Sequence, residues 1–421
     1  MTPGGEAAEV GDVRRGLPSL RTDRRLWGWA AAHGVSEVGD EIFYVALVFT
    51  AAKVASPTLA GMIVAVAVAP RAVVSLFAGA AVDRLEPRRV MLWSDVSQIV
   101  VLVGAVSGSA LGGPSVGVLI ALGLSFGLAS AFYGPAAFSF PRQLRPREDL
   151  TRVAGVRQFL GRAAAVGGPP LGGVIVAATG LAGALLVDAV SFALIAVVLV
   201  VVRPRMPLSR QRGPSVLADV RAGLGHVAQT PHVRDLVISL AGLNVFLSPV
   251  VSVGIALRSA EDGWGPAALG LLMGAIGAGA AVGTLAVIPW RPQRPIYAGL
   301  LLIIVQPFAM AMVGFAAFPA MVAAMAMIGL SAGLASPLLS GAFQATVDEE
   351  YLGRTSSITS LADDTLVPLA LAGFGALAGL VNLTIACLVF ASAFLLQLIY
   401  SLSRTHLRDL AMPEPEKSMR C

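Results

Sequence analysis

Five polar side chains share one face of an apolar stretch near the start of the sequence. They are His33, Glu37, Asp40, Glu41 and Tyr44, and they recur at the three- and four-residue intervals of one side of a helix. Ionisable groups inside an apolar helix are costly, so they are candidates for function. Carboxyl groups this close together cannot all ionise freely, which suits a site that binds and releases protons. We expect this face to point into a water-filled cavity.

Asp40 is the first candidate for a proton carrier. It lies about 14 residues into its stretch, or about 21 Å along a helix, which is near the middle of a membrane. Arg162 stands at a similar depth in a later stretch, so we predict that it pairs with Asp40, with Glu37 or Glu41 as the relay. The alternative is a static acid–base pair that serves assembly only.

A second set of charges could couple protons in the same way. Arg71 lies midway along another apolar stretch, and Asp363 and Asp364 lie in the first half of a stretch far along the chain. Asp95 and Asp188 stand near the ends of their stretches, and we interpret these two as structural.

The composition requires a membrane around these groups. Of the 421 residues, 56% are hydrophobic and only 13% are charged, and the mean hydropathy is +0.79. A soluble domain is about 25% charged, so a soluble globule and a disordered chain are both excluded. Two cysteines exclude a disulfide scaffold. The sequence therefore predicts an all-α protein that crosses the bilayer many times.

Twelve apolar runs are long enough to span a bilayer as helices. Lys53 and Arg258 are the only basic residues on one alternate set of loops, whereas the other loops and the tails hold 25 of the 30 lysines and arginines. This asymmetry predicts cytoplasmic termini in a cell inner membrane, and it makes the net charge a matter of topology rather than of nucleic-acid binding. The runs are 26–52, 58–82, 90–111, 115–140, 150–179, 182–202, 236–257, 264–288, 296–317, 320–346, 356–380 and 381–402.

The polar segment 203–235 divides these runs into two sets of six. Within it, residues 216–229 have the pattern of a short amphipathic helix, which we place on the membrane surface. The plan is that of two six-helix halves related along the membrane normal. The predicted organisation is a tail, a first half, the linker, a second half and a tail, at 1–25, 26–202, 203–235, 236–402 and 403–421.

The loop between the second and third runs carries a long motif. It reads Gly79-Ala-Ala-Val-Asp-Arg-Leu-Glu-Pro-Arg-Arg89, and it resembles the signature loop of the major facilitator superfamily, G-x-x-x-D-R-x-G-x-R-R, with Glu86 in place of a glycine. Such a charged loop would hold one conformation by pairing with acids of facing loops and release it in the other. The candidate gating residues are Gly79, Asp83, Arg84, Arg88, Arg89, Arg142 and Arg354.

A second motif lies in the fifth run. Gly155 and the stretch Gly168-Pro169-Pro-Leu-Gly172-Gly173 resemble the antiporter motif of that superfamily, G-x8-G-x3-G-P-x-x-G-G. In the family this motif marks exporters. We expect the glycines to form a thin face that packs against the eighth run near Gly277. The alternative is a kinked packing helix without directional meaning.

The resemblance covers roughly residues 26–400 and extends to the twelve-span drug–proton antiporters, which include macrolide and siderophore exporters. It implies a monomeric, proton-coupled exporter without a cofactor or a bound metal. Polar neutral residues are sparse in the runs, which favours a hydrophobic, often cationic, substrate over a sugar. The candidate cavity residues are Tyr44, Tyr133, Asn244, Trp264 and Gln344.

Two other functions were weighed. A proton-coupled importer or a lipid or lysolipid transporter of the same fold is the main alternative. A membrane-embedded enzyme is disfavoured, because the four histidines form no sequence cluster and no phosphate-binding loop of the Walker type is present.

Overall fold

The computed structural model describes most of the chain, and everything said of the structure below concerns this part. In it every regular element is a helix. The described residues are 18–72, 74, 86–206, 225, 227, 229–347 and 349–405.

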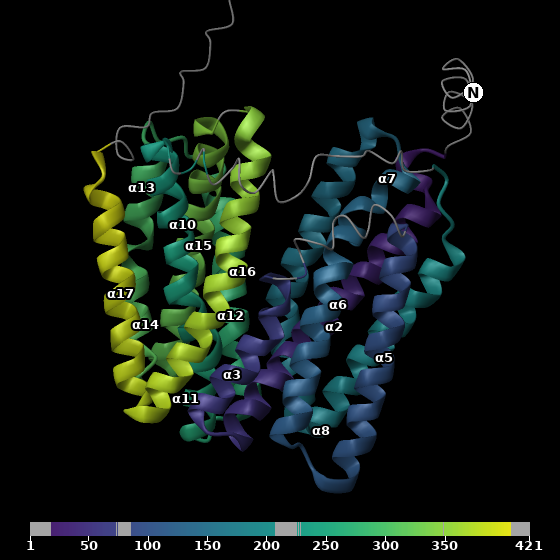
Figure 1. Cartoon of the computed structure of the whole chain (residues 1–421), viewed down its shortest axis with the longest axis horizontal. Helices are drawn as coiled ribbons and strands as arrows, with labels where there is room; N and C mark the ends of the chain where they lie inside the picture. Colours follow the sequence, from purple (N-terminus) through teal and green to yellow (C-terminus); the bar gives the residue numbers. More distant parts are fainter. Residues whose placement is uncertain are drawn as a thin grey trace, which may run out of the picture.

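The helices fall into two bundles that stand side by side (Figure 1). The first bundle comprises η1 Leu20–Thr22, α2 Arg24–Val54, α3 Pro57–Val68, α5 Pro87–Gly112, α6 Val116–Ser139, α7 Pro141–Leu144, η2 Arg147–Asp149 and α8 Leu150–Val201. The second comprises α10 Pro231–Pro249, the π-helical turn η3 Val250–Gly254, α11 Ile255–Glu261, α12 Gly265–Val287, α13 Pro295–Leu302, η4 Ile303–Val305, α14 Gln306–Met312, α15 Phe318–Thr346, α16 Glu349–Leu380 and α17 Leu383–Ser403.

Local sequence signals set where several helices begin. The Ser56 hydroxyl caps α3 by accepting from the Leu59 backbone N–H, and Ser115 caps α6 in the same way. The Asn382 side chain caps α17 by accepting from the Ile385 N–H at 2.8 Å. Within α8, Gly180 has φ of +69°, which bends the element between the predicted runs 150–179 and 182–202.

Nine helices of the described part are long and apolar enough to cross a membrane. This confirms an all-α protein of the membrane type. The bent α8 is one of the nine, and the apolar helix Pro57–Ala72 is too short to be among them. The 31-residue α2 is not among the nine, because any 18-residue window of it contains the three acids Glu37, Asp40 and Glu41, which is more charge than a simple apolar span carries. Its polar face therefore distinguishes α2 from helices that only span lipid.

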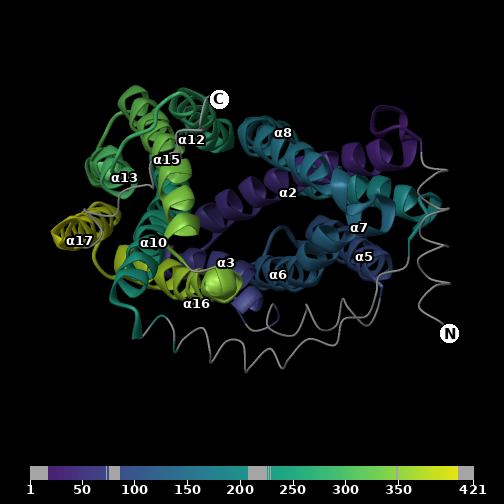
Figure 2. The same ribbon diagram turned by 90° about the horizontal axis from the view of Figure 1, so that it is seen from above.

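The two bundles meet along two helix pairs, α8 with α12 and α3 with α16 (Figure 2). Both contacts depend on glycine. A Cβ atom at Gly61 would lie 2.8 Å from the Cα of Gly375, and one at Gly270 would lie 2.9 Å from the Cα of Gly173. Backbones this close leave no room for side chains, so the two bundles touch almost backbone to backbone at these points.

Each bundle is closed by an ion pair that joins its first helix to the end of its last. In the first bundle, Asp23 caps α2 and binds Arg205, which follows α8, and it lies 3.5 Å from Arg145. In the second, Asp235 near the start of α10 lies 3.5 Å from the Arg404 guanidinium just after α17. We call these pairs the two clasps. Their equivalent positions support an internal repeat.

The first clasp should stabilise the protein. We expect Asp23→Asn to lower the free energy of unfolding by about 3 kcal/mol, because two guanidinium groups lose their buried counter-charge. Thermal unfolding in detergent measures the loss. Asp262→Asn is the matched control, since its pair with Arg258 joins two partly exposed side chains of one helix end and should contribute little. Equal stability of the two variants would refute the role of the clasp.

The same clasp should make the free energy of unfolding depend on pH in the acid range. Burial raises the pKa of Asp23, but hydrogen bonds from Arg205 and from the Leu26 backbone N–H, with the charges of Arg205 and Arg145, outweigh it and hold the pKa below its ordinary value. A lowered native pKa contributes stability above the ordinary pKa, and this is lost as the pH falls through the native value. Asp23→Asn should therefore flatten the acid limb of the stability profile.

Candidate functional site

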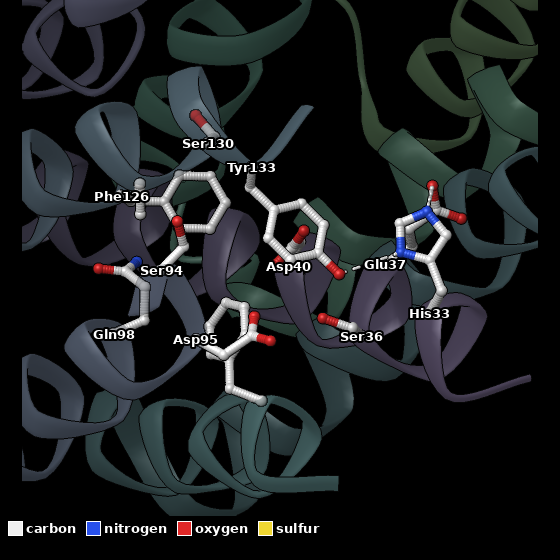
Figure 3. A pocket seen from close by; sticks show the side chains of 12 residues that line it. His33, Ser36, Glu37, Asp40, Ser94, Asp95, Gln98, Phe126, Ser130 and Tyr133 are labelled. Carbon is white, nitrogen blue, oxygen red and sulfur yellow. Dashed lines mark hydrogen bonds and ion pairs between the residues drawn. The ribbon is translucent and has the colours of Figure 1, made fainter. Parts of the chain in front are cut away.

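A polar pocket lies inside the first bundle, between α2, α5, α6 and α8 (Figure 3). It is unlike the surrounding apolar core, since nine of its twelve lining residues have polar side chains. It contains several of the residues that sequence analysis singled out, and α5 adds others. Its lining residues are His33, Ser36, Glu37, Asp40, Ser94, Asp95, Gln98, Phe126, Ala129, Ser130, Tyr133 and Phe192.

One end of the pocket is organised around His33. Its imidazole stacks on Trp29, with ring centroids 5.5 Å apart, and its Nδ1 lies 3.3 Å from the Tyr133 hydroxyl of α6. Its Nε2 lies 3.5 Å from the Glu37 carboxyl group one turn along α2. The predicted polar face of α2 therefore points inward at this level, and the aromatic groups fix the position of the imidazole.

Carboxyl groups from three helices gather in and beside the pocket, where Asp40 is half-buried and Asp95 and Asp188 are buried. Asp188 of α8 accepts a hydrogen bond from Ser191 at 3.2 Å, and a Cβ atom at Gly39 would lie 2.5 Å from its oxygen, so α8 runs directly against α2 here. Asp95, Asp188 and Glu37 all lie within electrostatic range of Asp40. One oxygen of Asp40, one of Asp188 and both of Asp95 are buried without a hydrogen-bond partner. Buried oxygens of this kind are costly unless they carry protons or meet a ligand.

The predicted pair between Asp40 and Arg162 is wrong. The Arg162 side chain is exposed, and it forms no ion pair with Asp40 in the part of the chain that the structure describes. Arg157 takes its place at the pocket, where its charge acts on His33, Glu37 and Tyr133. The physical reason is helical phase, because the two arginines are five residues apart and lie on different sides of α8.

A signal for Arg157 was present in the spacing of small residues. Gly161 lies against Glu37, and Gly168 lies so close to Glu41 that a Cβ atom would come within 2.5 Å of it. Residues 157, 161, 164 and 168 form one stripe at helical intervals, so the glycines mark the side of α8 that faces α2. Arg157 continues that stripe, whereas Arg162 does not.

The motif glycines of α8 are divided between two neighbours. Gly172 faces α2, since a Cβ atom there would lie 3.0 Å from the Ile42 Cα, whereas Gly173 faces α12 across the bundle interface. A Cβ atom at Gly277 of α12 would lie 2.9 Å from the Val166 Cα, so this part of the expected packing is present. Gly155 has open space around it. Pro169 also lies on the α12 side, where its carbonyl oxygen approaches Gly270.

The second charge set lies between α3, α10 and α16. The Asn244 side-chain amide donates to the Asp363 carboxyl group at 3.0 Å, so the structure brings these two candidates together. Arg71, just past α3, acts electrostatically on Asp364 across the bundle interface. This set is therefore separate from the pocket in the first bundle.

The five predicted cavity residues do not form one wall. Tyr133 lines the pocket of the first bundle, whereas Tyr44 lies beside Ser252 of the second. Trp264 precedes α12, where it packs edge-on against Phe318 with centroids 5.1 Å apart. Asn244 binds Asp363, and Gln344 of α15 is exposed. Sequence position along a helix could not reveal which bundle each side chain faces.

Part of the predicted gating loop lies outside the described residues, namely Gly79, Asp83 and Arg84, and so does the side chain of Arg354. Arg88 was expected to pair with acids of facing loops, but it donates to the carbonyl oxygens of Leu199 and Val200 at the end of α8.

Two other basic residues of this region also find local partners. Arg89 pairs with Glu86 at 3.0 Å. Glu86 has φ of +63°, which explains why the family motif has glycine at this position. Arg142 is exposed and lies over the Phe138 ring.

The all-helical fold fits the comparison with known families. The sequence matches the profile of the Major Facilitator Superfamily over residues 29–371. The chain belongs to this superfamily. It is therefore a multi-pass membrane transporter, and it is not an enzyme.

Curated relatives are similar at low identity over most of their length. The MFS-type transporter YfiS of Bacillus subtilis is 24% identical, over 88% of this chain and 91% of that protein. The multidrug efflux pump Tap of Mycolicibacterium fortuitum is 26% identical, over 81% of this chain and 86% of that one. The enterobactin exporter EntS of Salmonella choleraesuis is also 26% identical, over 71% of this chain and 73% of that protein.

Solved structures share the fold. A bacterial homologue of the iron transporter ferroportin, in an inward-facing state, superposes with a TM-score of 0.72 at 17% identity, covering 92% of this chain and all of that one. The nucleoside transporter NupG superposes with a TM-score of 0.71 at 12% identity, covering 90% and 99%.

Proposed function

We propose that the protein is a proton-driven exporter of hydrophobic, often cationic, small molecules. It works as a monomer by alternating access in the plasma membrane. Twelve spans form two six-helix halves, 26–202 and 236–402, joined by the linker 203–235, with both tails in the cytoplasm. In this reading α2 and the apolar run 58–82, which contains α3, both span the membrane, and α8 counts as two spans divided at Gly180.

The observation that carries this proposal is the set of buried carboxyl groups in the first bundle. A carboxylate fixed by a basic partner is a permanent charge, whereas one without a partner exchanges protons with its surroundings. Asp40 has an oxygen without a partner and several other acids within range. A proton at this site would neutralise a charge that otherwise opposes movement of the surrounding helices.

The interface between the bundles supports alternating access. Contacts at α8–α12 and α3–α16 involve glycine backbones, which part without pulling side chains out of pockets. The charges of Arg71, Asp363 and Asp364 lie at this interface and would bind a cationic substrate or position it. The rarity of neutral polar groups still favours an apolar cargo.

The relatives support the direction of transport. Tap and EntS are both named for export, and both match this chain over more than two thirds of its length. The superposed structures include a nucleoside transporter, so the fold by itself allows many substrates.

Transport by purified protein in liposomes tests the proposal. With the membrane potential held at zero, an acidic lumen should drive accumulation of tetraphenylphosphonium, and a protonophore should abolish it. An importer coupled to protons would instead accumulate substrate when the exterior is acidic. A lipid transporter would move fluorescent lysolipid without any gradient, and either result would replace the present proposal.

A further inference from the structure

The pocket of the first bundle contains an acid to which the proposed function assigns no role of its own. Asp95 projects from α5, its side chain is fully buried, and both of its carboxyl oxygens lack a hydrogen-bond partner. Figure 3 shows its carboxyl group and that of Asp40 beside the Tyr133 ring. Near a span end, such a residue suggests a structural role, but a structural carboxyl group would be expected to have partners.

We infer that Asp95 is a second proton-binding carboxyl group, which exchanges its proton through Asp40 inside the pocket of the first bundle, called the chamber below. This inference rests on the proposed proton coupling and extends it. It makes two protons, rather than one, available to each transport cycle.

The groups that face Asp95 offer it no counter-charge. Across the pocket, α2 presents Asp40, and α6 presents the neutral Tyr133. From α8, Asp188 approaches the same carboxyl cluster, while the Arg157 charge acts at the His33 end. On α5 itself, the pocket neighbours are a serine and a glutamine. Adjacent buried carboxyl groups without a cation cannot all be ionised, so protons must be shared among them.

The size of the chamber decides which ligand fits. Its volume is about 40 Å³, counted as the space open to the centre of a water molecule, and one water needs about 10–15 Å³ on that measure. A few waters fit and an organic molecule does not. Within the described part of the chain, no group of three or more histidine, cysteine or acidic side chains could hold a metal ion. Protons carried by water are the ligand that suits this space.

Asp40 lies between this chamber and the side of α2 that faces the second bundle. It neighbours Glu41, whose charge acts on Tyr44, and Tyr44 contacts Ser252 of the second bundle. A proton leaving Asp95 would pass to Asp40 and then toward Glu41. Protons and substrate therefore occupy different places, and the two are coupled through helix movement rather than by competition for one carboxyl group.

Infrared spectroscopy tests proton binding directly. The wild type at neutral pH should show the C=O stretching bands of more than one protonated carboxyl group, and Asp95→Asn should remove one of them. Asp262→Asn is the control and should leave the bands unchanged. An unchanged spectrum for Asp95→Asn would overturn the inference. If that variant does not fold, Asp95→Glu takes its place and should shift one band; no shift would overturn the inference equally.

Transport gives a second, thermodynamic readout. With the potential at zero, a gradient of about one pH unit limits accumulation to about 100-fold for two protons and about tenfold for one. The accumulation ratio reached by Asp95→Asn should fall from about 100-fold to about tenfold, while the variant still transports substrate. If the wild type ignores the gradient, the proposed function fails, and the infrared result still decides whether Asp95 binds a proton. If the wild type accumulates substrate in response to the pH gradient and Asp95→Asn reaches the same accumulation ratio, only the present inference fails.

Discussion

Asp40→Asn is expected to abolish accumulation of substrate against its gradient and to leave downhill exchange of labelled for unlabelled substrate intact. The amide keeps the size of the side chain but binds no proton, so the chamber loses its connection to the bundle interface. Asp40 is suited to this role because Glu37, Glu41, Asp95 and Asp188 all lie within its electrostatic range. The measurement is uptake into liposomes with an imposed pH gradient, beside an exchange assay without one.

Asp262→Asn is again the matched control for that experiment. It makes the same chemical change in an exposed position after α11, and it should accumulate substrate as the wild type does. If Asp40→Asn still concentrates substrate, the proton carrier lies elsewhere. Asp363 or Asp364 with Arg71 would then be the next pair to test.

Gly173→Ala is expected to shift the balance between the two transport conformations and to slow turnover severely. A Cβ atom at this position would lie 2.6 Å from the Pro266 carbonyl oxygen and 3.0 Å from the Gly270 Cα. Backbone atoms cannot rotate away, so α8 and α12 must separate, at a cost of about 1–3 kcal/mol or about 5- to 150-fold in the equilibrium. The conformation in which α8 and α12 are apart is therefore favoured by that free energy.

Two other glycines of the same helix make the experiment specific. Gly167→Ala meets no atom within 4 Å and should behave as the wild type. Gly172→Ala presses on Ile42 within the first bundle, so it should lower thermal stability without moving the bundles. Lys53 and Val381 are both exposed, and distances between spin labels at these two positions report the separation of the two bundles. A wild-type distance distribution in Gly173→Ala would show that the contact does not control the conformation.

Periodicity predicted the helices well because each apolar run must satisfy its own backbone in lipid, and this needs no knowledge of its neighbours. It also found the polar face of α2. It failed for Arg162 because depth along a helix says nothing of rotation about its axis. It undervalued Asp95 for a related reason: only the packing of α5 against α6 and α8 shows that this carboxyl group points inward.

The two clasps have a consequence for the history of the protein. Asp23 with Arg205, and Asp235 with Arg404, join the beginning of each bundle to its own end. A unit that closes on itself needs no covalent neighbour to keep its shape. If the two bundles arose by duplication of one ancestral half, that half would have needed this property to pair with a second copy of itself.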